Sequence, residues 1–278
     1  AITFTLGGAD ASLLEINPST GVVSLKSQAN FESGKTSYAF TVTATDADGD
    51  GSATASAAKA VTISLVDINE APANTIANAT KTTAEDTAVT IDGLSVADVD
   101  AGDTSLTVTL TSTNGTLSVA NNVTSGLDGS GIAGSGTGTV TLTGTITAIN
   151  ATLAGTDAVQ FTPTLNFTGA AAISITSKDD ENLQDVDADA VGVTVTAVDD
   201  APEVTSSATG TANEENSDLA IYTATASDVE SEAITFTLGG ADASLLEINP
   251  STGVVSLKSQ ANFESGKTSY AFTVTATD

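Results

Sequence analysis

Acidic side chains dominate the chemistry available to this chain. Its 278 residues include 35 Asp and Glu against seven Lys, which gives a formal net charge of −28 at pH 7. It contains no His and no Cys. Carboxylates are ligands for hard cations such as Ca²⁺, which takes about six to eight oxygens. Because so much negative charge destabilises a compact state through self-repulsion, the composition indicates a protein that binds cations.

One local segment has the opening of a calcium loop. Residues 46–51 read Asp-Ala-Asp-Gly-Asp-Gly, the Asp-x-Asp-x-Asp-Gly start of an EF-hand. The Glu that closes such a loop is missing, because Ala57 stands in its place. A hairpin loop rich in Gly and Asp fits these residues better, and we expect Asp46 to serve a shared metal site instead.

Several function classes are disfavoured by the same composition. Binding to nucleic acid or to an anionic membrane surface relies on Lys and Arg, which are scarce here. Without His or Cys, the commonest catalytic base and the soft nucleophile are both absent, and we expect no enzyme activity. The Thr row of residues 139–147 could present a face for ice or a glycan, but Thr is also an ordinary outward residue of a strand.

The elements that must position these acids are predicted to be strands. Apolar residues alternate with Thr and Ser in short runs, the pattern of half-buried strands. The fold class predicted is all-β, with tandem Greek-key sandwiches of the immunoglobulin-like type. A single helical turn is expected at 148–153. The predicted strands are 2–6, 21–26, 37–45, 59–66, 88–92, 105–112, 139–144, 158–162, 172–178 and 191–198.

An internal repeat sets the organisation. Residues 233–278 are identical to residues 1–46, so the repeat period is 232 residues. Two acidic linkers end in Ala-Pro, at Val66–Pro72 and at Val198–Pro202, and each follows a strand-like run. They predict three segments: a first segment (1–72) lacking its N-terminal part, a larger middle segment (73–202), and a last segment (203–278) lacking its C-terminal part. Such an array is expected to be a piece of a longer repetitive protein.

The first and last segments together resemble a cadherin domain. Six motifs follow one another in the order of that family. They are Asn213-Glu214-Glu215-Asn216, Asp228-Val229-Glu230, Leu14 to Gly21, Asn30-Phe31-Glu32, Tyr38 to Asp46, and Asp67 to Pro72.

The middle segment is similar, more loosely, to the cadherin-like modules of giant bacterial adhesins of the RTX type. The motifs that carry this likeness are Glu85-Asp86-Thr87, Asp98-Val99-Asp100, Asn166 to Gly169, Lys178-Asp179-Asp180, and Asp199 to Pro202.

The resemblance implies Ca²⁺ as the cofactor, held at the junctions between segments. At the first junction it implies the ligands Asn30, Glu32, Asp67, Asn69, Glu70, Asp98, Asp100 and Asp179. At the second junction it implies Glu85, Asp199, Asp200, Asp228, Glu230 and Asp278. The linker at 67–70 offers more oxygens than the one at 199–200, so more calcium is expected there.

The resemblance also implies a mechanical role. The expected function is a calcium-rigidified extender or filament segment of an extracellular adhesin on a bacterial cell surface. Homophilic adhesion and a self-assembling matrix fibre are the alternatives. The expected partners are neighbouring repeats and, in a filament, identical chains.

Overall fold

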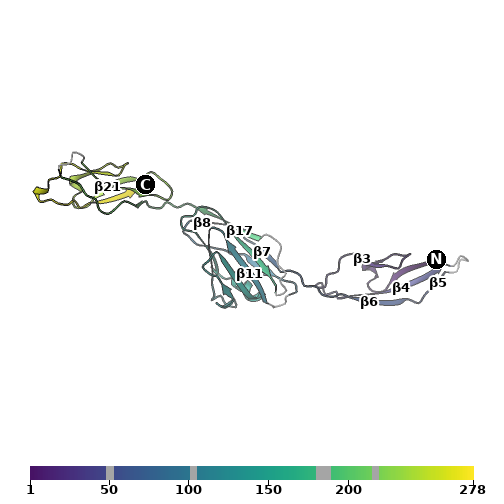
Figure 1. Cartoon of the computed structure of the whole chain (residues 1–278). Helices are drawn as coiled ribbons and strands as arrows, with labels where there is room; N and C mark the ends of the chain where they lie inside the picture. The colour runs from purple at the N-terminus through teal and green to yellow at the C-terminus, as the bar shows by residue number, and fades with distance from the viewer. Residues whose placement is uncertain (48–52, 101–104, 180–188, 215–218) are drawn as a thin grey trace. The chain divides into compact units, whose positions relative to one another are not determined.

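The computed structural model describes residues 1–47, 53–100, 105–179, 189–214 and 219–278 (Figure 1). The described residues form strands joined by turns, with one α-helix and three 3-10 turns, so the predicted all-β fold with tandem domains is confirmed. None of the helices in these ranges has the length and apolar character needed to cross a membrane. Most of the predicted loop 46–51 lies outside the described residues.

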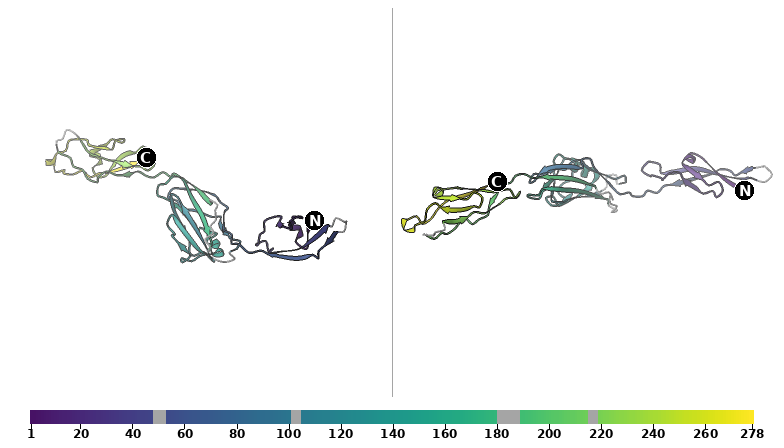
Figure 2. Two further views of the ribbon diagram at one scale, coloured as in Figure 1. Left: turned by 45° about the vertical axis from the view of Figure 1, so that its right-hand side comes forward. Right: turned by 90° about the horizontal axis from the view of Figure 1, so that it is seen from above.

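The first segment is organised around one long strand. Strand β4 pairs with β1, β5 and β6, all antiparallel (Figures 1 and 2). Its sequence alternates, so that Tyr38 and Phe40 point inward and form a core with Leu14. The elements are β1 (Ile2–Gly7), η1 (Ala11–Leu13), β2 (Leu14–Ile16), β3 (Val23–Leu25), β4 (Ser37–Ala47), β5 (Ala53–Ala55) and β6 (Lys59–Ser64).

The turn between β2 and β3 is built by its side chains. The Asn17 Oδ1 accepts hydrogen bonds from the backbone N–H groups of Ser19 and Thr20, each at 3.0 Å. Gly21 then adopts a φ of 73°, a left-handed value that glycine tolerates without strain. The turn therefore returns the chain antiparallel, with Glu15 opposite Ser24.

The middle segment has the largest core. A six-stranded sheet runs in the order β13-β14-β11-β16-β17-β8, with smaller sheets β12-β15-β9 and β10-β7. The elements are β7 (Ala73–Ile76), β8 (Thr80–Ala84), β9 (Val89–Thr90), β10 (Leu94–Ala97), β11 (Ser105–Ser112), β12 (Gly115–Val119), β13 (Ile132–Ala133), β14 (Thr139–Thr145), α1 (Ile146–Leu153), β15 (Val159–Pro163), β16 (Gly169–Lys178) and β17 (Asp189–Thr196).

Alternation explains which side of that sheet is buried. On β11 the side chains of Leu106, Val108 and Leu110 are at most 1% exposed, and Val140 and Leu142 on β14 are fully covered. The Thr residues between them form cross-strand pairs, such as 107 with 143 and 109 with 141, on the opposite face. The Thr row therefore accompanies a buried apolar row, as expected of an ordinary strand.

The predicted helical turn is a two-turn helix. At its start the Thr145 hydroxyl accepts a hydrogen bond from the N–H of Ala148 at 3.2 Å, an N-cap. Asn150 exchanges two hydrogen bonds with the backbone of Val96, at 2.9 and 2.8 Å. These two hydrogen bonds fix β10, the strand that leads directly to Asp98 and Asp100.

The last segment repeats the local structure of the first. Its core is formed by Leu246, Val255 and Leu257. Three sheets are present, in the orders β18-β20, β19-β23-β22 and β21-β24. The elements are β18 (Glu203–Val204), β19 (Ala220–Thr223), β20 (Ala226–Ser227), β21 (Thr235–Gly239), η2 (Ala243–Leu245), β22 (Leu246–Ile248), β23 (Val254–Leu257), η3 (Phe263–Ser265) and β24 (Thr273–Thr277).

One ionic contact recurs in both copies. The Asp10 carboxylate accepts from the Lys35 ammonium and from the Ala39 N–H, each at 2.7 Å. Asp242 makes the same contacts with Lys267 and Ala271. The ammonium contact and then the backbone N–H lower the pKa of both carboxyls. These contacts connect the residue before the 3-10 turn to Ala39 of β4 in the first copy, and to the identical Ala271 in the second.

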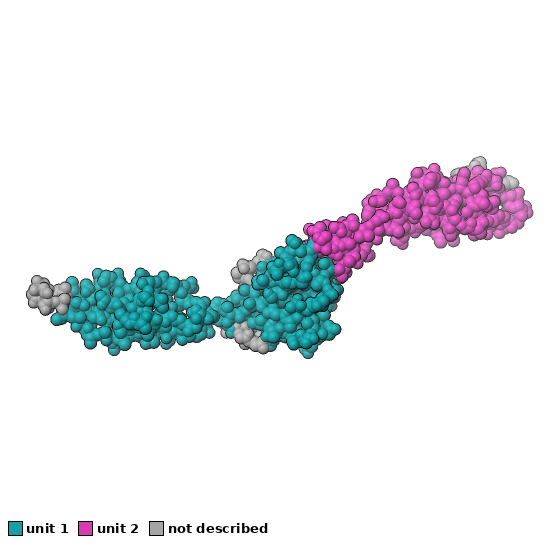
Figure 3. Space-filling model, turned by 180° about the vertical axis from the view of Figure 1, so that it is seen from behind, with its two compact units in different colours: residues 1–81, 89–161, 172–192 teal, residues 82–88, 162–171, 193–278 magenta. Residues whose placement is uncertain are grey.

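Each sheet lies within one predicted segment. By compactness, the chain divides into two units (Figure 3). The first comprises residues 1–81, 89–161 and 172–192, and the second comprises 82–88, 162–171 and 193–278. The segment limits at 72 and 202 therefore remain a prediction.

Candidate metal sites

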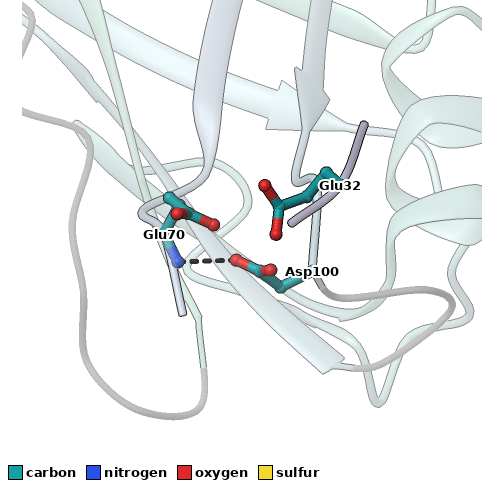
Figure 4. A group of neighbouring side chains, drawn as sticks. All are labelled: Glu32, Glu70 and Asp100. Carbon is teal, nitrogen blue, oxygen red and sulfur yellow. Dashed lines mark hydrogen bonds between the residues drawn. The ribbon is translucent and has the colours of Figure 1, made fainter. Parts of the chain in front are cut away.

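Three carboxylates from distant parts of the sequence converge in the first unit (Figure 4). Glu32 lies in the turn after β3, Glu70 lies in the linker between β6 and β7, and Asp100 follows β10. One oxygen of each lies within 4.8 Å of the others. The backbone N–H of Glu70 donates to Asp100 Oδ2 at 2.5 Å. The linker backbone is thus bound directly to a residue of the middle segment.

The electrostatics of this first cluster are unfavourable without a cation. Glu32 Oε1 and Asp100 Oδ1 are buried and have no hydrogen-bond donor among the described residues. Loss of water around the carboxyl, and then the contact with and charge of Asp100, raise the pKa of Glu70. The charges of Glu32 and Asp67 add to this effect. A buried anionic oxygen needs a donor or a cation, and these oxygens point toward one another.

Four further predicted ligands lie next to this cluster. The Asn69 amide donates to Asp179 Oδ2 at 2.6 Å, which fixes the linker to the end of β16. Asp98 Oδ1 accepts from the N–H of Asp100 at 3.0 Å. Asp67 is close enough for its charge to act on Glu70.

Two predicted ligands are engaged elsewhere. The Asn30 side-chain oxygen accepts from the N–H of Ser33 at 2.6 Å, so it stabilises the turn that carries Glu32. Asp46 lies near the end of β4, where it stands opposite Ile2 of β1 and Thr54 of β5. These contacts leave Glu32, Glu70 and Asp100 as the groups whose charges face one another.

A second cluster forms in the other unit, from Glu85, Asp200 and Glu230, whose oxygens also lie within 4.8 Å. Glu85 is 2% exposed, and its Oε1 accepts from the N–H of Val198 at 2.8 Å. The N–H of Asp200 donates to Glu230 Oε2 at 3.3 Å. Like the first cluster, this one binds the linker backbone to a carboxylate of the segment that follows.

The same electrostatic conflict is present here. Glu85 Oε2, Asp200 Oδ2 and Asp228 Oδ2 are buried without a hydrogen-bond donor among the described residues. Burial raises the pKa of Asp200, and the charges of Glu85, Asp86, Asp199 and Asp228 raise it further. Within the described ranges, no Lys forms an ion pair with either cluster.

A third group joins Asp199 and Asp278 with Glu232, all exposed. Sequence reasoning missed Glu232 and the nearby Asp86. Asp228 Oδ1 accepts from the N–H of Glu232 at 3.0 Å, and Ser231 has a φ of 62°. That turn directs Glu232 toward Asp199 of the linker. In the sequence, the only sign of this third group was the alternation of acids at positions 228, 230 and 232.

The donors in all three groups are carboxylate oxygens. The chain has no His or Cys, which excludes the usual ligands of zinc and copper sites. Three carboxylates can supply up to about six oxygens, and calcium accepts irregular arrangements of them. Magnesium requires a stricter octahedron and retains water. The residues present therefore fit calcium, and the orphaned buried oxygens are the observation that supports this fit.

The sequence matches no protein-family model and no curated protein. Solved structures are similar to it over nearly the whole chain. Mouse cadherin-23 EC22-24 aligns with 100% of this chain and 80% of its own, with a TM-score of 0.48 and 19% identity. The structural neighbours are cadherin domains.

Two protocadherin fragments are also similar. Protocadherin gammaB7 EC3-6 aligns with a TM-score of 0.45 and 17% identity, over 95% of this chain and 59% of that one. Protocadherin Gamma B2 domains 1-5 align with a TM-score of 0.47 and 14% identity, over 99% and 52%. The chain thus spans little more than half the length of either fragment.

Proposed function

We propose that this chain is a calcium-rigidified extender segment of a repetitive extracellular adhesin. The single observation that carries the proposal is the pair of carboxylate clusters, each with buried oxygens that lack a donor. Each cluster includes a residue of an Ala-Pro linker, Glu70 or Asp200. A cation bound there would fix the linker to the strands on either side of it.

The mechanical role follows from how the clustered carboxylates interact without calcium and with calcium. Without calcium, like charges repel one another across the linker, which favours open arrangements. With calcium, the same charges become ligands of one ion, and the linker loses conformational freedom. The sequence resemblance to bacterial adhesin modules, and the identical repeats, support placement on a bacterial cell surface. The predicted limits of the three segments, at 72 and 202, are part of the proposal.

Calorimetric titration of the whole chain with Ca²⁺, after removal of metal with a chelator, tests the binding step. Asp100→Asn and Asp200→Asn should each weaken one class of sites by about tenfold, because each removes one charge from three. The matched control is Asp157→Asn, whose carboxylate belongs to none of the three acidic groups and accepts a hydrogen bond from the Thr90 hydroxyl at 2.6 Å. Absence of calcium binding, or equal losses in the control, would contradict the proposal.

A further inference from the structure

A short acceptor motif is confined to the middle segment. The motif is Asn-x-Thr with x other than Pro, which receives a sugar on the Asn side chain in secreted proteins. Five of the eight Asn residues at 73–202 begin such a motif, and none of the seven at 1–72 and 203–278 does. The five are Asn78, Asn114, Asn122, Asn150 and Asn166. Because Thr is frequent in all three segments, its abundance alone does not account for this distribution.

Three of these motifs lie at turns or loops, with both the Asn and the Thr exposed. They are Asn114 to Thr116 at the turn between β11 and β12, Asn122 to Thr124 after β12, and Asn166 to Thr168 between β15 and β16. The backbone of Asn114 has a φ of 55° and that of Asn166 a φ of 56°, left-handed values typical of Asn in a turn. In all three motifs the amide and the hydroxyl are therefore within reach of an enzyme.

The motif at Asn150 is blocked by the fold. Asn150 lies on α1, and its amide nitrogen donates to the carbonyl of Val96 at 2.8 Å. The Thr152 side chain is fully buried, and its hydroxyl accepts from the N–H of Leu127 at 2.7 Å and donates to the carbonyl of Ala148 at 3.0 Å. Both groups that a transferase must reach are thus engaged inside the segment.

The motif at Asn78 is exposed, but its reactive atom is engaged. The amide nitrogen of Asn78, which would carry the sugar, donates to the carboxylate of Asp92. Gly93 lies against the same nitrogen, since a Cβ placed on this glycine would be 3.0 Å from it. We therefore expect less modification at Asn78 than at the three exposed motifs in turns and loops.

We propose that the middle segment carries N-linked sugars at Asn114, Asn122 and Asn166. The donor is a sugar activated on a nucleotide or lipid diphosphate, and the catalyst is a separate transferase. The Asn amide nitrogen forms a bond to the anomeric carbon and gives one proton to a base of the transferase. The bond from that carbon to the diphosphate oxygen breaks, and the diphosphate leaves. The proposal uses the extracellular placement of the proposed function but not its calcium sites.

Mass spectrometry of the chain recovered from the surface of the cells that make it tests the modification. Peptides with the three exposed motifs should carry sugar, and the peptide with Asn150 should not. Asn122→Gln and Thr124→Ala should each remove one sugar addition. The matched control is Asn121→Gln, which changes a neighbouring exposed Asn outside any motif and should keep every addition. A chain without sugar, or with as much sugar on Asn150 as on Asn122, would overturn the proposal.

A transfer assay separates the effect of the fold from that of the motif. The folded whole chain, in chelator, is incubated with a purified Asn-glycosyltransferase and glucose activated on a nucleotide diphosphate. Transfer to Asn122 should exceed transfer to Asn150 by at least about fivefold, because Asn150 is reached only when the segment opens locally. Synthetic peptides of residues 119–127 and 147–155 should be modified alike, since neither is folded. Equal transfer to both sites of the folded chain would contradict the assignment, and the chelator makes this result independent of calcium binding.

Discussion

Replacing Glu85 by Gln should have opposite effects with and without calcium. Glu85 is 2% exposed, and its Oε2 lies among the anionic oxygens of Asp200 and Glu230 without a donor. In Gln, an amide N–H replaces that oxygen and can donate to a neighbouring carboxylate. The other oxygen can still accept from the N–H of Val198. Unfolding without calcium should therefore become harder, because a repulsion becomes a hydrogen bond.

With calcium the same change removes one of three charged ligands. At a calcium concentration one hundred times the dissociation constant, binding stabilises the folded state by about 2.7 kcal/mol. If the dissociation constant rises tenfold, the stabilisation falls to about 1.4 kcal/mol. The calcium-induced increase in unfolding free energy should thus be about halved for this site.

Differential scanning calorimetry of the wild type, Glu85→Gln and Asp157→Asn, each with chelator and with calcium, measures both effects. A variant that loses similar stability in both conditions would show that Glu85 is a structural residue only. An unchanged calcium response would show that it is no ligand. Either result would refute the electrostatic reasoning applied to both clusters.

Further outcomes follow from the same charges. The pKa values of Glu70 and Asp200 are raised, so near these pKa values the folded state binds more protons than the unfolded state. Without calcium, the free energy of unfolding should therefore increase as the pH falls from neutral toward the ordinary carboxyl range. Acid titrations followed by circular dichroism measure this change. The pKa values of Asp10 and Asp242 are lowered, which has the opposite effect. Their contribution to the free energy of unfolding is present above the pKa of the unfolded state and is lost as the pH falls through the pKa of the folded state. Asp10→Asn should therefore flatten the acid limb of the unfolding curve. Small-angle scattering should give a better-defined maximum dimension with calcium than with chelator, and an unchanged distance distribution would count against stiffening. Ion counts by mass spectrometry test where more calcium binds. The sequence predicts more ions beside Asp67, whereas in the structure two clusters of three carboxylates include Asp199 or its neighbour Asp200.

Strands with a strong alternation of apolar and polar residues were predicted best from the sequence. Strand β11 was predicted with the bounds observed, and β14, β16 and β17 within three residues at either end. Strands such as β8, with the sequence TKTTA, were missed because they have almost no apolar residue to reveal their period. Their pairing is set by neighbours distant in the chain, which local patterns do not report.

The repeat shows the same limit within one sequence. Residues 37–40 pair with β6 and are in a strand, whereas the identical residues 269–272 have no partner strand among the described residues and are not. In the acidic groups, sequence motifs named Glu32, Glu70 and Asp100, but the local turn at Ser231 that directs Glu232 was not predictable from spacing.

The Thr pairs on β11 and β14 have a consequence for the order in which the chain folds. A β-branched side chain has few χ1 rotamers, so Thr loses little conformational entropy when a strand forms. The middle segment covers its outer sheet face with such residues, while Val108, Val140 and Leu142 on the inner face are fully buried. It therefore needs no ion to close its core. We expect it to fold first and unfold last, so that Asp100 of the first cluster and Glu85 of the second are fixed before the linkers become ordered.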